Sequence, residues 1–210
     1  MAGTFNRHRR ASRPAGTAPQ PPPSPAVLAD FDTQLMLQAR QGNREAGSAL
    51  IRRNADRIAR YVTRLVGDHR PAEDLTQDVF LQALAHADQY QPTAKVVTWL
   101  YRIATNTALN YLKQAHVRRR AHTPPDHSLQ VADSSAPAPD RQMSLDELRH
   151  QVSQALDGLP VNQRIALTLF QFEECSYEQI AAVLDVSVEA VRSLLMRART
   201  TLRRKLRGLV

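Results

Sequence analysis

Apolar residues recur at helical intervals in two stretches of the chain. In the first, about residues 28–115, the repeat runs from position 35 to 65, breaks at Gly67, and resumes from 75 to 84. A further amphipathic helix is expected over about 97–113. This stretch is therefore predicted to form a small bundle of helices.

The second stretch, about residues 141–207, carries clearer helix signals. Ser144 and Glu147 form one predicted capping box, and Ser176 and Gln179 form another, each satisfying free amides where a helix starts. A short helix, a tight turn at residues 185–187 and a longer final helix follow the second box. This order is typical of a helix-turn-helix, whose second helix enters the major groove of DNA.

The final helix has two distinct faces. One inward stripe is apolar and comprises Val188, Val191, Leu195, Ala198, Leu202 and Leu206. The residues outside it are polar, basic or flexible, namely Arg192, Ser193, Met196, Arg199 and Arg203. A solvated face with arginines near a helix C-terminus is the alternative interpretation. The preceding capped helix and turn favour DNA binding.

Proline-rich stretches mark the boundaries between these segments. Six of the 13 prolines lie between Pro14 and Pro25, and four more lie between His122 and Asp140. Both stretches are rich in Ala, Ser and Thr and lack helical periodicity, so we expect a disordered tail and a flexible linker. The predicted fold is all-α, with two small helical domains.

Charge is distributed unevenly over the 210 residues. The formal net charge is +8, but every acidic residue lies between Asp30 and Glu189. Arginines dominate both ends, and the remaining body has a small negative balance. Binding to a polyanion is therefore predicted for local segments only.

Several kinds of chemistry are disfavoured by the residues present. Cys175 is the single cysteine, which excludes an internal disulfide, and its neighbours Glu173 and Glu174 disfavour a thiolate. No histidine spacing fits zinc. No apolar run approaches the roughly 18 residues of a membrane span. We expect a reduced, soluble, cytoplasmic protein without metal, cofactor or membrane insertion.

One face of the helix predicted at residues 73–84 is acidic. Asp74 and Asp78 lie one turn apart, so paired acid–base catalysis has to be considered. No nucleophile, glycine-rich phosphate loop or metal-ligand spacing accompanies them, and we therefore expect no catalytic site. An exposed polar face is the simpler interpretation.

Five motifs in order resemble one family. They are Ala72–Phe80, Thr98–Leu112, Leu159–Arg164, Ser176–Ala181 and Val191–Arg199. Together they are similar to the bacterial extracytoplasmic-function (ECF) sigma factors, and the block ending at Leu112 is close to the envelope-stress sigma-E type. The resemblance covers both helical stretches.

The resemblance implies a domain organisation and a function. Residues 1–27 would be a tail, 28–115 sigma region 2, 116–140 a linker and 141–210 sigma region 4. Such a protein binds RNA polymerase core, at the clamp coiled coil of the largest subunit and the flap of the second. It directs initiation at promoter DNA, and an anti-sigma factor is an expected partner.

The resemblance also implies three sets of site residues. The core-binding set is Asp74, Gln77, Asp78 and Phe80. The set for the minus-10 element, where unstacked bases are captured, is Tyr90, Lys95, Asn106, Asn110, Lys113, Arg118 and Arg119. The set for the minus-35 element is Tyr177, Glu189, Arg192, Ser193, Met196, Arg197 and Arg199.

The sequence departs from the family pattern at a few positions. Gly47 stands where a large apolar residue is usual, so we expect a looser first helix pair. Glu189 and Ala190 replace a common Gly-Thr, and Leu194 replaces a frequent basic residue. Asp185 replaces a frequent turn glycine and can adopt a positive φ at modest cost.

The helix-turn-helix by itself is also compatible with another function. A stand-alone helix-turn-helix regulator is the alternative function, but it has no need of the acidic helix around Asp74.

The length of the linker allows a physical check. Residues 117–140 span about 80 Å when extended but only roughly 27 Å as a free coil. Promoter elements two DNA turns apart lie about 70 Å apart. We expect polymerase to hold the linker extended, and the free protein to be flexible or folded against an inhibitor.

Overall fold

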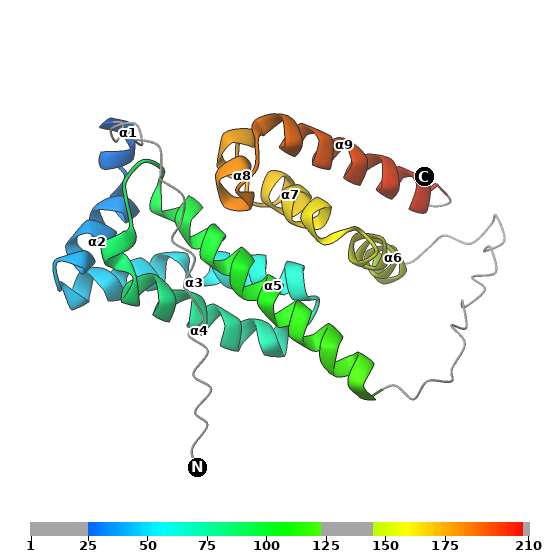
Figure 1. The fold of residues 1–210 in the computed structure, drawn as a ribbon, viewed down its shortest axis with the longest axis horizontal. Coiled ribbons are helices and arrows are strands. Elements are labelled where there is room, and N and C mark those ends of the chain that lie inside the picture. Colours follow the sequence, from blue (N-terminus) through cyan, green and yellow to red (C-terminus); the bar gives the residue numbers. More distant parts are fainter. Residues whose placement is uncertain (1–24, 123–144, 208–210) are drawn as a thin grey trace, which may run out of the picture.

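A computed structural model describes residues 25–122 and 145–207. Within these two ranges every regular element is a helix, and the helices form two groups (Figure 1). The predicted all-α fold with two helical domains is confirmed. The predicted tail before Pro25, most of the linker and the capping residue Ser144 lie outside the described residues.

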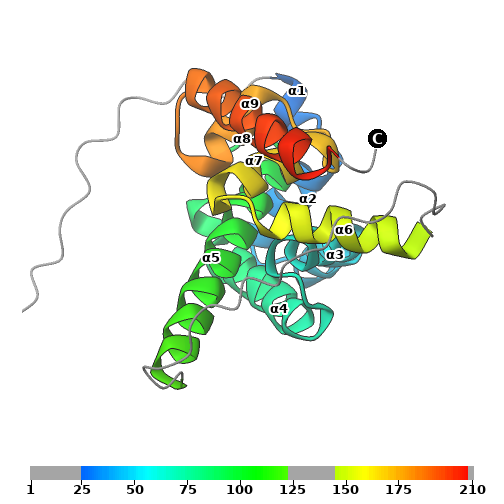
Figure 2. The ribbon, with the colours of Figure 1, turned by 90° about the vertical axis from the view of Figure 1, so that its right-hand side faces the viewer.

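The first domain contains the helices up to residue 122. They are α1 (Pro25–Leu28), α2 (Phe31–Arg40), α3 (Arg44–Val66), α4 (His69–Ala85), the 3-10 turn η1 (Ala87–Gln89) and α5 (Val96–His122). α5 is longer than the periodicity predicted, because it continues into residues 116–122, which we assigned to the linker. Figure 2 shows its C-terminal part extending beyond the other helices. α1 likewise begins inside the predicted tail.

Polar caps separate the helices of this domain. A turn with Gly42 at φ 92° interrupts the apolar repeat, and Asn43 then accepts a hydrogen bond from the Ala46 amide at 3.1 Å to begin α3. Gly67 ends α3 in the left-handed conformation at φ 77°. The break predicted at Gly67 is therefore confirmed, and its cause is a glycine C-cap.

Helix α3 is the centre of the first domain. It packs against α2, α4 and α5, and its buried side chains include Leu50, Ile58 and Leu65. Gly47 is buried at the same helix, where an added Cβ would lie 3.4 Å from the Leu84 side chain. The space between α3 and α4 at this position is therefore just wide enough for a methyl group.

The second domain contains the remaining helices. They are α6 (Leu145–Asp157), α7 (Val161–Gln171), α8 (Tyr177–Leu184) and α9 (Val188–Lys205). Helix α7 packs on α8 and α9, and the buried face of α9 comprises Val191, Leu195 and Ala198. The predicted apolar stripe on the final helix is confirmed at these positions.

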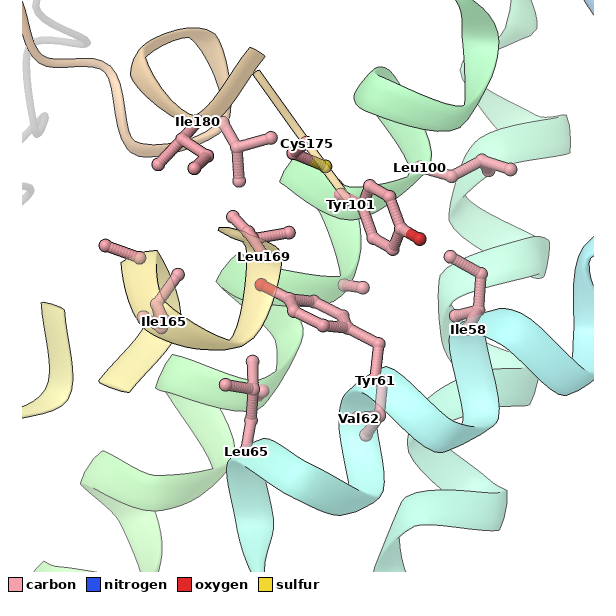
Figure 3. Packing of buried hydrophobic residues seen from close by; sticks show 14 of the residues in the cluster. Ile58, Tyr61, Val62, Leu65, Leu100, Tyr101, Ile165, Leu169, Cys175 and Ile180 are labelled. Carbon is pink, nitrogen blue, oxygen red and sulfur yellow. The ribbon is translucent and has the colours of Figure 1, made fainter. Parts of the chain in front are cut away.

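The two domains pack directly against each other. Helix α8 contacts α5, and α7 contacts α3, so that α9 lies on the outer side (Figure 1). One apolar cluster runs through both domains and includes Tyr61 and Leu65 from the first and Ile165 and Leu169 from the second (Figure 3). The free chain therefore has a closed arrangement, in which its two groups of helices share a core.

Candidate functional site

The acidic residues predicted on α4 are exposed together. Asp74, Gln77 and Asp78 all lie on the solvent side of the helix, whereas Phe80 is buried. The helix presents this face because Leu75 and Val79, which alternate with the polar residues, are buried against the domain core. Three of the four predicted core-binding residues are thus available for a partner.

An apolar groove lies beside this acidic face. It runs between α3 and α4 and is lined by Ile51, Ala55, Thr76, Gln77, Phe80, Leu81 and Leu84. Phe80 contributes to its wall, so a buried position does not exclude this residue from a binding surface. Leu81 is 67% exposed, which is unusual for a leucine at the centre of a helix.

Leu81 is a candidate that the sequence reasoning missed. It lies four residues after Gln77 and seven after Asp74, so it shares their side of α4. That spacing is a signal that could have identified it: an apolar residue on an otherwise polar helical face. The groove and the acidic face together make a surface suited to a partner with both apolar and basic groups.

The loop that precedes α5 is anchored by Tyr90. The sequence comparison with the family predicted that Tyr90 helps to capture an unstacked base, but its side chain is 1% exposed. Its hydroxyl donates to the Ala94 carbonyl at 2.8 Å and lies 3.3 Å from Thr33 Oγ1, and its ring packs against Trp99. These contacts anchor the loop in the free chain, and the role of Tyr90 at the minus-10 element stays a prediction.

Lys95 ends this loop and is exposed. Its Nζ lies 3.6 Å from the Asp30 carboxylate, which caps α2. This ion pair is half-exposed and therefore weak, so Lys95 can exchange Asp30 for another anion. Lys95 thus places one positive charge, available to a bound anion, on a loop whose backbone is held in place by Tyr90.

The exposed side of α5 gathers the predicted polar residues. Asn106, Asn110 and Lys113 are all exposed, and their spacing places them on one face of the helix. Arg118 lies further along and contacts Gln114 at 3.3 Å, whereas nothing is described for the side chain of Arg119. Arg102, exposed and one turn before Asn106, belongs to the same face and was missed by the sequence reasoning.

The helix-turn-helix forms as predicted, for identifiable local reasons. Ser176 and Gln179 make both hydrogen bonds of a capping box, at 3.2 Å and 2.8 Å, and begin α8. Asp185 ends α8 in the left-handed conformation at φ 57°, and the Ser187 hydroxyl then caps α9 by accepting from the Ala190 amide. The capping box, the turn and the second cap are all confirmed.

The outer face of α9 carries most of the residues predicted to read DNA. Arg192 lies 3.7 Å from Glu189, and both are exposed. The pKa of Glu189 is lowered, first by the hydrogen bond from its own amide, then by the Ser187 hydroxyl and by Arg192. Met196 is 62% exposed and Arg197 is exposed, while Ser193 is partly covered. These side chains can approach a DNA groove together.

Two further residues of the predicted minus-35 set, Tyr177 and Arg199, also have contacts within their own domain. The Arg199 guanidinium lies over the Phe170 ring at 5.2 Å, and the ring of Tyr177 packs against Phe170 at 5.5 Å. Arg199 remains exposed, so its charge is oriented by the ring and still reaches solvent. Tyr177 begins α8 and Arg199 lies in α9, so both residues belong to the helix-turn-helix, and both contact Phe170 of α7.

Cys175 is buried where the two domains meet. Burial, and to a smaller extent the neighbouring Glu173 carboxylate, raises the pKa of its thiol from 9.0 to about 11, while Arg57 opposes the shift. The direction agrees with the sequence argument, although burial is the larger cause. A thiol with this pKa is a poor nucleophile at neutral pH.

Residues 25–122 and 145–207 contain no group of three or more His, Cys, Asp or Glu side chains placed to hold a metal ion. Every helix in that part of the chain is too short or too polar to span a bilayer.

Comparison with known proteins assigns both domains. Sigma-70 region 2 matches residues 50–118, and Sigma-70 region 4 matches residues 149–202. The sigma-H factor of Pseudomonas aeruginosa RNA polymerase is 33% identical over 189 residues, which are 85% of this chain and 95% of that protein. The chain belongs to the ECF sigma factors. As a sigma factor, it associates with RNA polymerase and directs promoter-specific initiation of transcription.

Other relatives agree with this assignment. The ECF sigma-E factor of Escherichia coli is 33% identical over 191 residues, covering 85% of this sigma factor and 96% of its own length. Among solved structures, CnrH in complex with the cytosolic domain of CnrY superposes with a TM-score of 0.64 at 27% identity, over 85% of this chain and 99% of that one. The sigma factor RpoE of Bartonella quintana, in complex with the anti-sigma factor NepR, shares the fold with a TM-score of 0.60 at 24% identity.

Proposed function

We propose that this sigma factor docks on RNA polymerase core through α4. The observation that supports this most strongly is the exposed set Asp74, Gln77 and Asp78 beside an apolar groove that contains Leu81. A partner helix with basic and apolar residues complements such a surface in both charge and shape. The clamp coiled coil of the largest polymerase subunit is the partner that the family implies.

Two surfaces are proposed to recognise promoter DNA. The exposed side of α5, with Asn106, Asn110 and Lys113, would hold the melted minus-10 strand, aided by Lys95. The outer face of α9 would read the minus-35 element in duplex form, with Arg192 suited to a bidentate contact with guanine. The proposed region 2 and region 4 extend over residues 28–115 and 141–210.

We further propose that the protein acts in the cytoplasm and has no catalytic activity of its own. It would contribute binding energy, which offsets the cost of unstacking bases, while the polymerase performs the chemistry. A stand-alone helix-turn-helix regulator is not favoured, because such a protein would not need a region 2 domain.

An anti-sigma protein is proposed as a regulatory partner. CnrH was solved bound to the cytosolic domain of CnrY, and it shares this fold over most of both chains. The flap of the second polymerase subunit is proposed as a contact of region 4.

The docking proposal is tested by a double variant. Asp74→Ala with Gln77→Ala should abolish association with purified core polymerase and leave helical content unchanged, because both side chains are exposed. Asp88→Ala removes an exposed carboxylate of the same domain outside α4 and serves as the matched control. Undiminished core binding by the double variant, or an equal loss in the control, would count against this surface.

A further inference from the structure

Glu173 links the two domains of the closed chain. It lies between α7 and α8, and both hydrogen-bond partners of its side chain belong to the first domain. The Tyr101 hydroxyl donates to its Oε2 at 2.5 Å, and Arg64 donates to its Oε1 at 3.1 Å. We call these three residues the Glu173 latch. Among the residues that the structure describes, its carboxylate hydrogen-bonds only across the domain boundary, and it thereby stabilises contact between the domains.

Burial distinguishes the Glu173 latch from a surface ion pair, which water screens. The Glu173 side chain is only 6% exposed, while that of Arg64 is 35% exposed. A carboxylate at this depth needs hydrogen-bonding partners, and it loses them all if the domains separate without further change. Arg64 also lies 4.5 Å over the Phe172 ring, which adds a second contact between α3 and the segment that follows α7.

Apolar packing surrounds the Glu173 latch. Figure 3 shows Tyr61 and Leu65 of α3 facing Leu169 of α7, with Cys175 beside Tyr101 of α5. The two tyrosine rings lie 5.0 Å apart in an edge arrangement. The interface therefore resembles a continuous domain core rather than a loose surface contact.

In the closed arrangement the loop at residues 90–95, which we call the minus-10 loop, faces region 4. One pocket is lined on one side by Thr93, Ala94, Lys95 and Thr98 and on the other by Ser176, Glu178, Gln179 and Ala182. Across it, Gln179 Nε2 donates to Thr98 Oγ1 at 3.5 Å. The N-terminus of α8 is thus held next to the loop that the proposed function assigns to the minus-10 element.

Distance makes this arrangement incompatible with a complete promoter. Elements two DNA turns apart lie about 70 Å from each other. In the closed chain, atoms of the two domains are in hydrogen-bond contact. The 22 residues from 123 to 144 can span roughly 75 Å only when fully extended. A chain that contacts both elements must therefore break the Glu173 latch.

We propose that the closed form is an autoinhibited resting state built into this chain, held by the Glu173 latch. Opening separates Glu173 from Tyr101 and Arg64, uncovers the pocket between the minus-10 loop and α8, and frees α9 to reach a distant element. The functional meaning of this switch rests on the proposed function, whereas the closed state itself is a property of the free chain.

Cys175 provides a direct readout of opening. It is the single cysteine of the chain, and it is 6% exposed in the cluster shared by both domains. The rate at which a thiol reagent labels Cys175 in the free, full-length protein therefore reports how often the domains separate. Because the Glu173 carboxylate also raises the pKa of this thiol, the rates are compared per thiolate, from their dependence on pH. On that scale Glu173→Ala should label at least about tenfold faster, since a hydrogen-bonded charged pair of this kind is worth at least that factor in an equilibrium.

Glu174→Ala is the matched control. It removes the same charge from the next residue, which is exposed, and it should label within about twofold of the parent, the spread expected of a surface change. Tyr101→Phe, which keeps the ring and removes only the hydroxyl, should also speed labelling, by a smaller factor. Circular dichroism of each variant distinguishes domain opening from unfolding. Equal rates for Glu173→Ala and Glu174→Ala would overturn the proposal.

Small-angle scattering supplies an independent second measurement. The parent should be compact, and Glu173→Ala should have a larger radius of gyration; separated domains in the parent would overturn the proposal. Added core polymerase should accelerate labelling of the parent. If the variants behave as expected but core has no effect, the closed state stands and the proposed polymerase docking fails.

Discussion

Leu81 offers the sharpest test of the docking surface on α4. Its side chain is 67% exposed, so the fold itself uses only a minor part of its apolar area. Truncation to alanine should therefore change the free energy of unfolding by no more than about 0.5 kcal/mol. Any larger effect of Leu81→Ala on function must come from a partner that covers the residue.

The expected loss of affinity follows from the exposed area. Complete burial of a leucine is worth about 1.5–3 kcal/mol. Since roughly two thirds of that area remains for a partner, Leu81→Ala should weaken binding to core polymerase by about 1–2 kcal/mol, or roughly 5- to 30-fold in Kd.

Binding of a fluorescently labelled chain to purified core, followed by anisotropy, measures this change. Val117→Ala is the control, because Val117 of α5 is similarly exposed at 65% but lies away from α4. Its Kd for core should match that of the parent. An unchanged Kd for Leu81→Ala, or equal losses for both variants, would refute the assignment of this groove.

The remaining predictions concern stability, thiol chemistry and DNA. Gly47→Ala should stabilise the fold by about 0.5–1 kcal/mol, since the residue is mid-helix and the added Cβ meets Leu84 at an ordinary 3.4 Å. Gly67→Ala should instead destabilise it by about 1 kcal/mol, because φ is 77° there; thermal unfolding compares the two. Alkylation of native Cys175 should keep rising up to about pH 11, whereas the unfolded chain should level off near pH 9. Because folding raises this pKa, its contribution to stability is complete below pH 9 and is lost as pH rises toward 11. Arg192→Ala should weaken binding only to duplexes that carry the upstream element; an equal loss on random duplex in a competition assay would make it a phosphate contact.

Local signals in the sequence were sufficient for most of the second domain. The capping box at Ser176, the positive φ of Asp185 and the cap at Ser187 depend on neighbouring residues alone. The helical repeat then determines which side of α9 is buried. These features were predictable because capping and periodicity act over a few residues.

Contacts between distant residues were not predictable in the same way. Tyr90 is buried among residues that are distant in the sequence, and Thr33, 57 positions away, lies beside its hydroxyl. The Glu173 latch joins Glu173 to Arg64 across 109 positions. The local spacing of residues predicts neither pairing. The burial of Tyr90 and the closed arrangement of the two domains are therefore visible only in the three-dimensional structure.

The exposure of Leu81 illustrates an intermediate case. Its position on the polar side of α4 can be read from the spacing, but a single apolar residue on such a face is common. The groove beside it, which depends on how α3 and α4 pack, is what marks the residue as a candidate contact.

The central claim is that this chain brings RNA polymerase to specific promoters. Run-off transcription with purified core polymerase and a library of promoter sequences tests it most directly. The account predicts that the added protein yields transcripts from a subset sharing an upstream and a downstream element, and that Asp74→Ala with Gln77→Ala abolishes them. Transcripts that do not depend on the added protein, or an added protein that binds promoter duplexes without supporting any transcription, would contradict it.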